Sequence, residues 1–333
     1  MKYDKLFETA KIGSLTLKNR FIMGAMGVGF AEMNGNPTDR TVAYYEERAK
    51  GGYALIITEV TRVQDTEFCT PLEPSLGSDK FIPGWKKVTD AVHAQGAYIF
   101  PQLHQPGRQY TKAILGHDTS APSPIACPVF DETPHELTTE EVWDNIHMFG
   151  DAAVRAKKAG FDGVEIHAGH GYLVQQFLSQ FSNRRFDEFG GSIENRARFA
   201  CEICKDIKKK CGEDYPVIIK LSGEEKVPGG MTISDTKIIA KYLEEAGYDA
   251  IEVTICNYAS LDWMSAPEDE PMGFNAYNAE KIKEGVHIPV AAIDRINTPE
   301  IAEDIIETGK ADFVSISRQS LAEPFFPAKI KEG

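Results

Sequence analysis

The feature that most constrains this chain is a series of short β-branched runs that recurs along its whole length. Between these runs lie longer patterns with apolar residues on one helical face and a glycine at or beside the end. Strands that alternate with helices form right-handed βαβ units and a parallel sheet. A doubly wound open sheet has the same alternation, but eight units without a break in composition favour an α/β fold of the closed (β/α)8 TIM-barrel type. The expected strands are residues 21–26, 54–59, 98–103, 163–168, 216–222, 250–255, 289–294 and 313–318.

No linker composition interrupts the 333 residues, so residues 1–333 are expected to form a single barrel domain. The opening residues 6–20 alternate apolar and polar side chains around Gly13, which predicts an N-terminal hairpin at the bottom of the barrel. Residues 104–138 form a long loop after the third strand, on the face where barrel enzymes carry functional loops. Within that loop, Arg108, Tyr110 and His117 are expected to shape a substrate entrance.

Charge and composition exclude several classes of partner. The formal net charge of −14 repels nucleic-acid phosphates and anionic bilayers, so neither partner is expected. The charged start lacks the apolar core of a signal peptide, and no apolar run is long enough to cross a membrane. A cytoplasmic protein with six reduced cysteines is expected. The Cys201 and Cys204 pair lies in a helical pattern, where ordinary helix-face cysteines are the preferred interpretation over a redox or metal pair.

Polar residues stand at the expected carboxyl ends of the strands, where a barrel carries its active site. Interior strand positions should be apolar, so a ring of polar ends indicates a site, although Glu59 alone is equally well explained as a structural residue. The ring comprises Met26, Glu59, Gln102, His167, Lys220, Asp294 and Arg318, of which only Met26 is apolar.

The last two βα turns are the usual phosphate-binding part of such a barrel. Thr298 before Pro299 predicts a capped helix whose free N–H groups face the site. Arg295 and Arg318 add positive charge there, and a surface ion pair is the alternative interpretation for each.

The stretch GVEIHAGHGY gathers His167, His170 and Tyr172 at one strand end. Two imidazole N–H groups on one carbonyl oxygen stabilise a developing enolate, and a nearby phenol can deliver a proton. A lone strand histidine is usually a core residue, but this grouping favours catalysis. A metal-dependent barrel hydrolase is the rival hypothesis, and it needs His104 or Glu59 as a third zinc ligand. We expect no metal.

With these motifs, the sequence resembles the Old Yellow Enzyme family of NADH:flavin oxidoreductases, in the branch of 2,4-dienoyl-CoA and 2-enoate reductases. The resemblance covers essentially the whole chain. It rests on the motifs LKNRFIMGAM, YYEERAKGGYALIITE, PQLHQPGR, GFDGVEIHAGHGYLVQQFLSQFSNRRFDEFGGSIENRARF and the ending from IPVAAIDRINTPE to SRQSLAEP.

The resemblance implies an FMN at the barrel mouth. In the family the flavin ring lies against the end of strand one, a glutamine bonds its pyrimidine edge, and a cation after strand five faces that edge. Lys220 stands here where relatives usually carry arginine, which keeps the charge but loses the bidentate fork. The cofactor-binding residues so implied are Ala25, Met26, Gly27, Gln102, His167, Lys220, Asp294, Arg295, Ser317 and Arg318.

Four positions depart from the family pattern. Ala25 replaces a proline, and Gly27 stands where relatives carry a side chain that tunes the flavin. Asp294 and Ser317 replace two phosphate-loop glycines. A serine can bond phosphate, whereas an aspartate repels it unless its side chain turns away.

The implied activity is FMN-dependent ene reduction. Hydride passes from NADH or NADPH through flavin N5 to the β-carbon of an α,β-unsaturated carbonyl compound, while Tyr172 protonates the α-carbon and His167 and His170 hold the oxygen. Enoates, enoyl-CoA esters, steroid enones and flavonoid enones all fit this pattern. The alternative within the family is a flavin-binding electron-relay subunit.

Larger members of this branch continue into an iron-sulfur motif and further flavin domains, and none of the six cysteines here has that spacing, so no iron-sulfur cluster is expected. The chain is therefore expected to be either a short member that takes hydride directly from a nicotinamide or part of a larger system with an electron-donor partner. A homo-oligomer is also possible under this hypothesis.

Overall fold

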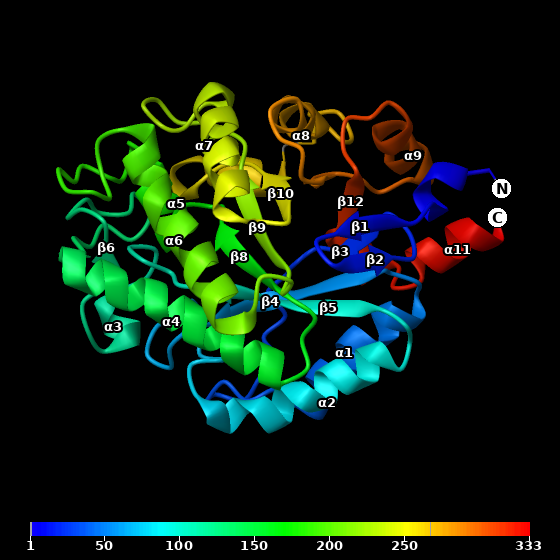
Figure 1. Cartoon of the computed structure of the whole chain (residues 1–333), viewed down its shortest axis with the longest axis horizontal. Coiled ribbons are helices and arrows are strands. Elements are labelled where there is room, and N and C mark those ends of the chain that lie inside the picture. Colours follow the sequence, from blue (N-terminus) through cyan, green and yellow to red (C-terminus); the bar gives the residue numbers. More distant parts are fainter. Residues whose placement is uncertain (1, 267) are drawn as a thin grey trace.

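A computed structural model describes residues 2–266 and 268–333. Eight parallel strands close into a barrel in the order in which they occur along the chain (Figure 1). The last strand pairs with the first, with Val314 opposite Phe21, which confirms closure rather than an open sheet. The strands are β3 (Phe21–Met23), β4 (Leu55–Arg62), β5 (Tyr98–His104), β8 (Val164–Ala168), β9 (Val217–Ser222), β10 (Ala250–Thr254), β11 (Val290–Ala292) and β12 (Phe313–Ile316).

One long helix follows each barrel strand and packs on the outside (Figure 1). Thr38, Thr138, Thr232 and Thr298 accept hydrogen bonds from the first turns of four of these helices, which is why each begins where it does. The expected pairing of Thr298 with Pro299 at a helix start is confirmed. The helices are α1 (Asp39–Lys50), α2 (Ile82–His93), α4 (Thr139–Lys158), α6 (Ile193–Cys211), α7 (Ile233–Ala246), α8 (Ala276–Lys283), α9 (Pro299–Glu307) and α11 (Phe326–Glu332).

The N-terminal hairpin is confirmed as the antiparallel pair β1 (Ala10–Ile12) and β2 (Leu15–Leu17). Ile12 and Leu17 are fully buried, and they belong to a hydrophobic cluster that also contains Phe100 and Ile218 from the barrel strands. The hairpin therefore seals one end of the barrel and leaves the other end to the site.

Smaller elements decorate the opposite end. The long loop after β5 contains α3 (Lys112–Leu115) and a two-stranded sheet of β6 (Ser120–Ala121) and β7 (His135–Glu136). The remaining short elements are α5 (Leu173–Leu178), α10 (Arg318–Ala322), η1 (Asp4–Phe7), η2 (Asp79–Phe81) and η3 (Tyr258–Ser265).

Several strand boundaries differ from those expected. β3, β11 and β12 end earlier, so Met26 and Asp294 lie in turns beyond their strands and Arg318 begins α10. Asp294 and Arg295 have left-handed φ values of 87° and 51°, which no strand can contain. Conversely, β4 continues to Arg62 through an irregular register, so Glu59 lies inside a strand.

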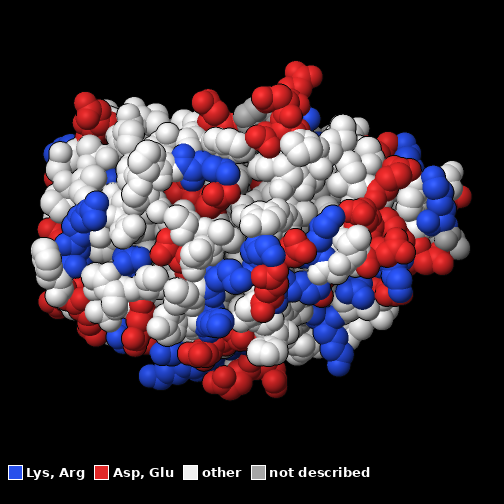
Figure 2. Space-filling view, turned by 90° about the horizontal axis from the view of Figure 1, so that it is seen from above, with Lys and Arg blue, Asp and Glu red and all other residues white. Residues whose placement is uncertain are grey.

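Charged side chains of both signs are mixed on the surface of the molecule. On the face shown in Figure 2, basic and acidic side chains are interspersed without a continuous basic stripe.

No helix in residues 2–266 and 268–333 is long and apolar enough to span a bilayer. Cys201 and Cys204 are buried free thiols on α6, as expected.

We predict that Phe100→Ala lowers the free energy of unfolding by about 3–5 kcal/mol, because it leaves a cavity between the hairpin and the barrel. Phe186→Ala is the matched control, since Phe186 is 104% exposed and should change stability by less than about 0.5 kcal/mol. Urea denaturation of both variants measures the difference. Equal losses of stability in the two variants would contradict the role assigned to the hydrophobic cluster between the hairpin and the barrel.

Candidate active site at the barrel mouth

A cavity of about 410 Å³, here called the mouth cavity, opens at the carboxyl ends of the strands. It brings together eight of the predicted site residues from four different βα units. The walls also include residues from the loops after β4, β5 and β10. The lining residues are Ala25, Met26, Gly27, Val60, Cys69, Thr70, Gln102, Gln109, Tyr110, Phe130, His167, His170, Tyr172, Lys220 and Tyr258.

The sharp turn after β8 brings His170 back beside His167. His170 and Gly171 have left-handed φ values of 57° and 78°, and the side chain of Gln175 accepts a 2.7 Å hydrogen bond from the Gly171 N–H. As a result the two imidazole centroids lie 5.2 Å apart with the rings at 87°. The Tyr172 ring lies 4.9 Å from His167. The three side chains that the sequence grouped are therefore neighbours around one cavity.

Both histidines are held in the neutral form. Burial lowers the pKa of His170 to about 3 and the pKa of His167 well below its usual value. His167 Nδ1 accepts from the Gly169 N–H at 3.3 Å, so its remaining proton belongs on Nε2. His170 Nε2 lies 2.9 Å from the Thr254 hydroxyl, which leaves Nδ1 as the second donor when Thr254 donates. Two neutral N–H donors are thus available for one acceptor oxygen.

Tyr172 keeps its proton because burial raises its pKa well above 10.0. Its hydroxyl is 2.8 Å from the hydroxyl of Tyr258, a residue on η3 that sequence reasoning missed. Burial also raises the pKa of Tyr258, to about 12. The pair therefore forms a hydrogen-bonded chain of two protonated phenols. The two tyrosines lie 86 positions apart in the sequence, and no sequence pattern links them.

An aromatic wall extends from Tyr258 through Phe130 to Tyr110. The centroid of the Phe130 ring lies 6.1 Å from that of Tyr258 and 6.2 Å from that of Tyr110. The expected contribution of Tyr110 to the entrance agrees with its place in the lining. His117 is exposed and bonds the Thr66 carbonyl. Arg108 differs from the expectation, because it is buried and donates to the carbonyls of Ile125 and Ala126, which fixes the loop.

Two buried polar pairs occupy the floor of the mouth cavity. Gln102 Nε2 donates to Glu165 at 2.5 Å, and Lys220 Nζ forms a 2.5 Å ion pair with Glu252. Burial raises the pKa of Glu165 to about 8, so it is a neutral acid at neutral pH. Burial opposes the charge on Lys220, but Glu252 outweighs it and the lysine pKa rises. A cation is therefore present on the floor, but it is already paired.

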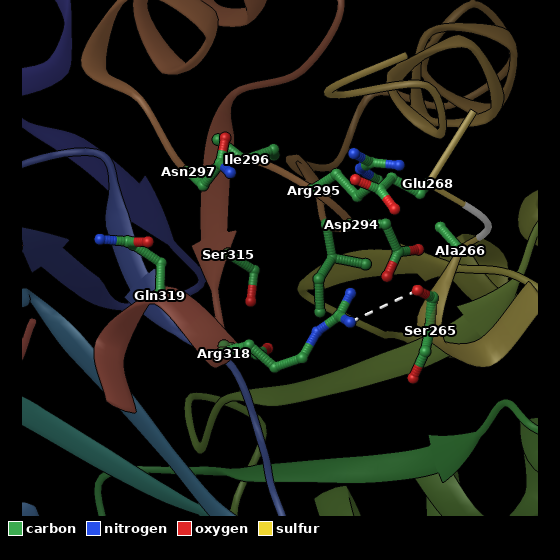
Figure 3. Close-up of a pocket in the computed structure, with 12 residues that line it drawn as sticks. Ser265, Ala266, Glu268, Asp294, Arg295, Ile296, Asn297, Ser315, Arg318 and Gln319 are labelled. Atoms are coloured by element: carbon green, nitrogen blue, oxygen red, sulfur yellow. Dashed lines mark hydrogen bonds between the residues drawn. The ribbon is translucent and has the colours of Figure 1, made fainter. Parts of the chain in front are cut away.

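A second cavity, of about 400 Å³, lies at the ends of β11 and β12 and is here called the phosphate cavity (Figure 3). The Ser315 and Ser317 hydroxyl oxygens are buried there without a hydrogen-bond partner. A Cβ on Gly24 would come within 2.5 Å of both oxygens, so only glycine leaves room for the two hydroxyl groups. Arg295 and Arg318 also line the cavity, and Arg318 points toward Ser265 in Figure 3.

One expectation for the phosphate cavity changes. The N-terminus of α9, whose first turn is capped by Thr298, does not contribute to the lining. The lining residues are Ser265, Ala266, Glu268, Ile293, Asp294, Arg295, Ile296, Asn297, Ser315, Ser317, Arg318 and Gln319. Asp294 lines the cavity and accepts a 3.0 Å hydrogen bond from Asn275. Burial raises the pKa of Asp294 to about 6, so a negative charge remains near any bound phosphate at neutral pH.

The zinc hypothesis finds no support in the geometry of the histidine pair. Among the described residues, the group whose ligand atoms approach within 4.8 Å of one another is Cys69, Glu73 and His104, which contains neither His167 nor His170. His104 Nε2 lies 3.1 Å from the Cys69 sulfur, and the His104 ring packs edge-on against Tyr172 at 4.4 Å. His104 therefore supports the tyrosine rather than supplying a third ligand to the pair.

The model of the NADH:flavin oxidoreductase / NADH oxidase family matches residues 5–333. The chain belongs to this family. A solved Old Yellow Enzyme homologue from Zymomonas mobilis superposes with a TM-score of 0.84 at 28% identity, covering 98% of this chain and 92% of that one. The resemblance to the Old Yellow Enzyme family is therefore confirmed.

Two curated relatives have a higher sequence identity to this chain than the Zymomonas mobilis protein has. An NADH oxidase of Thermoanaerobacter brockii is 43% identical over 99% of this chain, and a cinnamate reductase of Clostridium sporogenes is 40% identical over 99%. The chain spans 51% and 53% of their respective lengths, or about half of each.

We predict that the apoprotein loses stability as the pH rises from about 4.5 to about 8, since over this range Glu165 stays protonated in the fold and is ionised in the unfolded chain. A pKa raised by folding gives a contribution that is complete below the unfolded pKa and is lost as the pH rises through the folded pKa of about 8. In Glu165→Gln the melting temperature should fall less over this range than in the wild type. An identical pH dependence in the two proteins would show that Glu165 is ionised in the fold.

Proposed function

We propose that this chain is the FMN-binding part of an ene reductase that acts on α,β-unsaturated carbonyl compounds. The observation that carries the proposal is the convergence of two neutral imidazoles and a protonated phenol on one cavity. The name of the cinnamate reductase relative agrees with this chemistry.

The residues fit an FMN. Its phosphate suits the phosphate cavity, where Ser315 and Ser317 have unpartnered hydroxyls and Arg318 adds positive charge. Its ring suits the mouth cavity, with Ala25, Met26, Gly27 and Gln102 on the wall and Lys220 and His167 at its floor and side. When bound, FMN supplies the hydride that it accepts from NADH or NADPH.

The chain's own residues would perform the rest of the reaction. His167 and His170 donate to the carbonyl oxygen and stabilise the negative charge that develops there, each contributing about 2.7–4 kcal/mol by analogy with other oxyanion sites. Tyr172 delivers the proton to the α-carbon, and Tyr258 is positioned to pass a replacement proton to it. The aromatic wall covers one side of the cavity in which these atoms would react.

We expect Tyr172→Phe to slow reoxidation of the reduced enzyme by an enone about a hundredfold or more, because no other group supplies the proton as directly. Reduction of the flavin by NADPH or NADH should keep its rate. Anaerobic stopped-flow measurement of the two half-reactions separates them, and Tyr258→Phe should show a smaller effect because Tyr172 keeps its own proton. An equal loss of rate in both half-reactions would show that Tyr172 is not the acid. If the reduced flavin is reoxidised by oxygen or a partner protein but by no enone, the protein is better explained as an electron-relay subunit.

Asp294→Asn should tighten FMN binding about tenfold at neutral pH, because it removes a negative charge from the phosphate cavity and keeps the side-chain shape. The dissociation constant comes from quenching of flavin fluorescence on titration of the apoprotein. Riboflavin, which has no phosphate, is the control ligand and should bind both proteins alike. Weaker FMN binding by the variant would indicate that Asp294 holds the turn in place.

A further inference from the structure

A third cavity, of about 550 Å³, adjoins the mouth cavity and is here called the side cavity. The two cavities share Gly27, Val60 and Thr70 in their linings. A Cβ built on Gly27 would meet no atom within 4 Å, so the boundary between the cavities is open at this residue. A Cβ on Gly29, on the far side of the opening, would come no closer than 3.7 Å to Leu72. A molecule held at the histidine pair can therefore extend into the side cavity.

The side cavity combines apolar walls with two acidic side chains. Met33 and Leu72 are large hydrophobic residues that are 68% and 39% exposed, and they form part of its outer wall. Glu59 and Glu73 line the cavity although each is only 2% exposed, and the Oε1 atom of each is buried without a hydrogen-bond partner. None of its described lining residues is a lysine, arginine or histidine.

The other carboxyl oxygens of these acids hold the backbone that forms the cavity. Glu59 Oε2 accepts from the N–H groups of Val28 and Gly29 at 2.9 and 3.0 Å. Glu73 Oε2 accepts from the Cys69 N–H at 2.7 Å. Both acids are thus fixed in place, and the second oxygen of each is buried beside the cavity without a hydrogen-bond partner. Burial raises the pKa of Glu59 to about 7 and that of Glu73 to about 8, so both acids are partly protonated near neutral pH.

This chemistry selects among substrate classes. An apolar ring or chain gains from burial beside Met33 and Leu72. A hydroxyl at its far end can both donate and accept, so it satisfies a carboxyl group in either protonation state. A carboxylate or phosphate at the same place would meet acidic oxygens, and no cation lines the cavity to compensate it, which costs affinity. Arg62, whose charge lowers the pKa of Glu73, already donates to the carbonyls of Asp65 and Pro71.

We propose that the side cavity binds the distal part of the substrate and selects neutral enones with an apolar ring system that ends in a hydroxyl group. This inference rests on the proposed ene-reductase function and specifies its substrate class. Gly27 and Gly29 open the path, the apolar wall binds the skeleton, and Glu59 and Glu73 receive the hydroxyl.

The first test fills the side cavity. In the holoenzyme, Leu72→Trp should lower kcat/KM for para-hydroxybenzalacetone about tenfold relative to kcat/KM for methyl vinyl ketone, which is too small to leave the mouth cavity. Ile238→Trp is the matched control, since Ile238 is 44% exposed on α7 and lies outside the lining of the side cavity. An unchanged ratio in Leu72→Trp, or an equal change in Ile238→Trp, would overturn the inference.

The second test concerns the acidic pair. The wild type should prefer para-hydroxybenzalacetone to para-carboxybenzalacetone by about tenfold or more in kcat/KM. Glu73→Gln should reduce that preference severalfold, because the amide no longer repels an anion and still accepts from the Cys69 N–H. A wild type that prefers the carboxylate would overturn the inference.

The two proposals can fail separately. If no enone, including methyl vinyl ketone, reoxidises the reduced flavin, the proposed function fails. If methyl vinyl ketone reoxidises it but the aryl end group has no effect on kcat/KM, only the side-cavity inference fails.

Discussion

Burial of ionisable side chains at the barrel mouth is the constraint on which the chemistry of this protein depends. Closure of eight parallel strands places groups from distant parts of the sequence around the same small volume. Desolvation then decides their protonation states: the histidines lose their charge, the tyrosines keep their protons, and Glu165 stays neutral. Of the ionisable groups on the floor, Lys220 keeps its charge because Glu252 lies 2.5 Å away. The donors that the proposed reaction needs are therefore set by burial before any ligand binds.

The phosphate cavity shows how the backbone accommodates a departure from the family's glycines. Asp294 and Arg295 both adopt left-handed φ values, which cost about 1–2 kcal/mol for each non-glycine residue. The hydrogen bond from Asn275 to Asp294 fixes this turn, and the strained backbone lies beside the two unpartnered serine hydroxyls. Strain of this kind persists where surrounding contacts determine the conformation, and here it coincides with the cavity that fits a phosphate.

The fold and the grouping of the two histidines with Tyr172 could be predicted because their signals are local. Eight β-branched runs, glycine stops and threonine caps are properties of short segments, and His167, His170 and Tyr172 lie within six consecutive residues. Tyr258 and Cys69 could not be found this way, since only the closed barrel and the loops beyond its strands bring them to Tyr172 and His104. Glu165 and Glu252 were hidden for another reason: they lie inside strands that look apolar, and their pairing with Gln102 and Lys220 appears only when neighbouring strands are in register.

The side chains proposed for the reaction and those proposed to select the substrate lie on different parts of the fold. His167 and Lys220 lie on β8 and β9, which the barrel hydrogen bonds hold rigidly. The side cavity comes largely from the loops after β3 and β4, including Gly27, Gly29 and Leu72, and β4 itself adds Glu59 and Val60. Substitutions in those loops change the volume offered to a substrate without moving the histidine pair, because no barrel strand has to shift. A chain built in this way can keep one reaction while its substrate range follows the side chains of two short segments, and here glycine at positions 27 and 29 leaves the passage between the two cavities open.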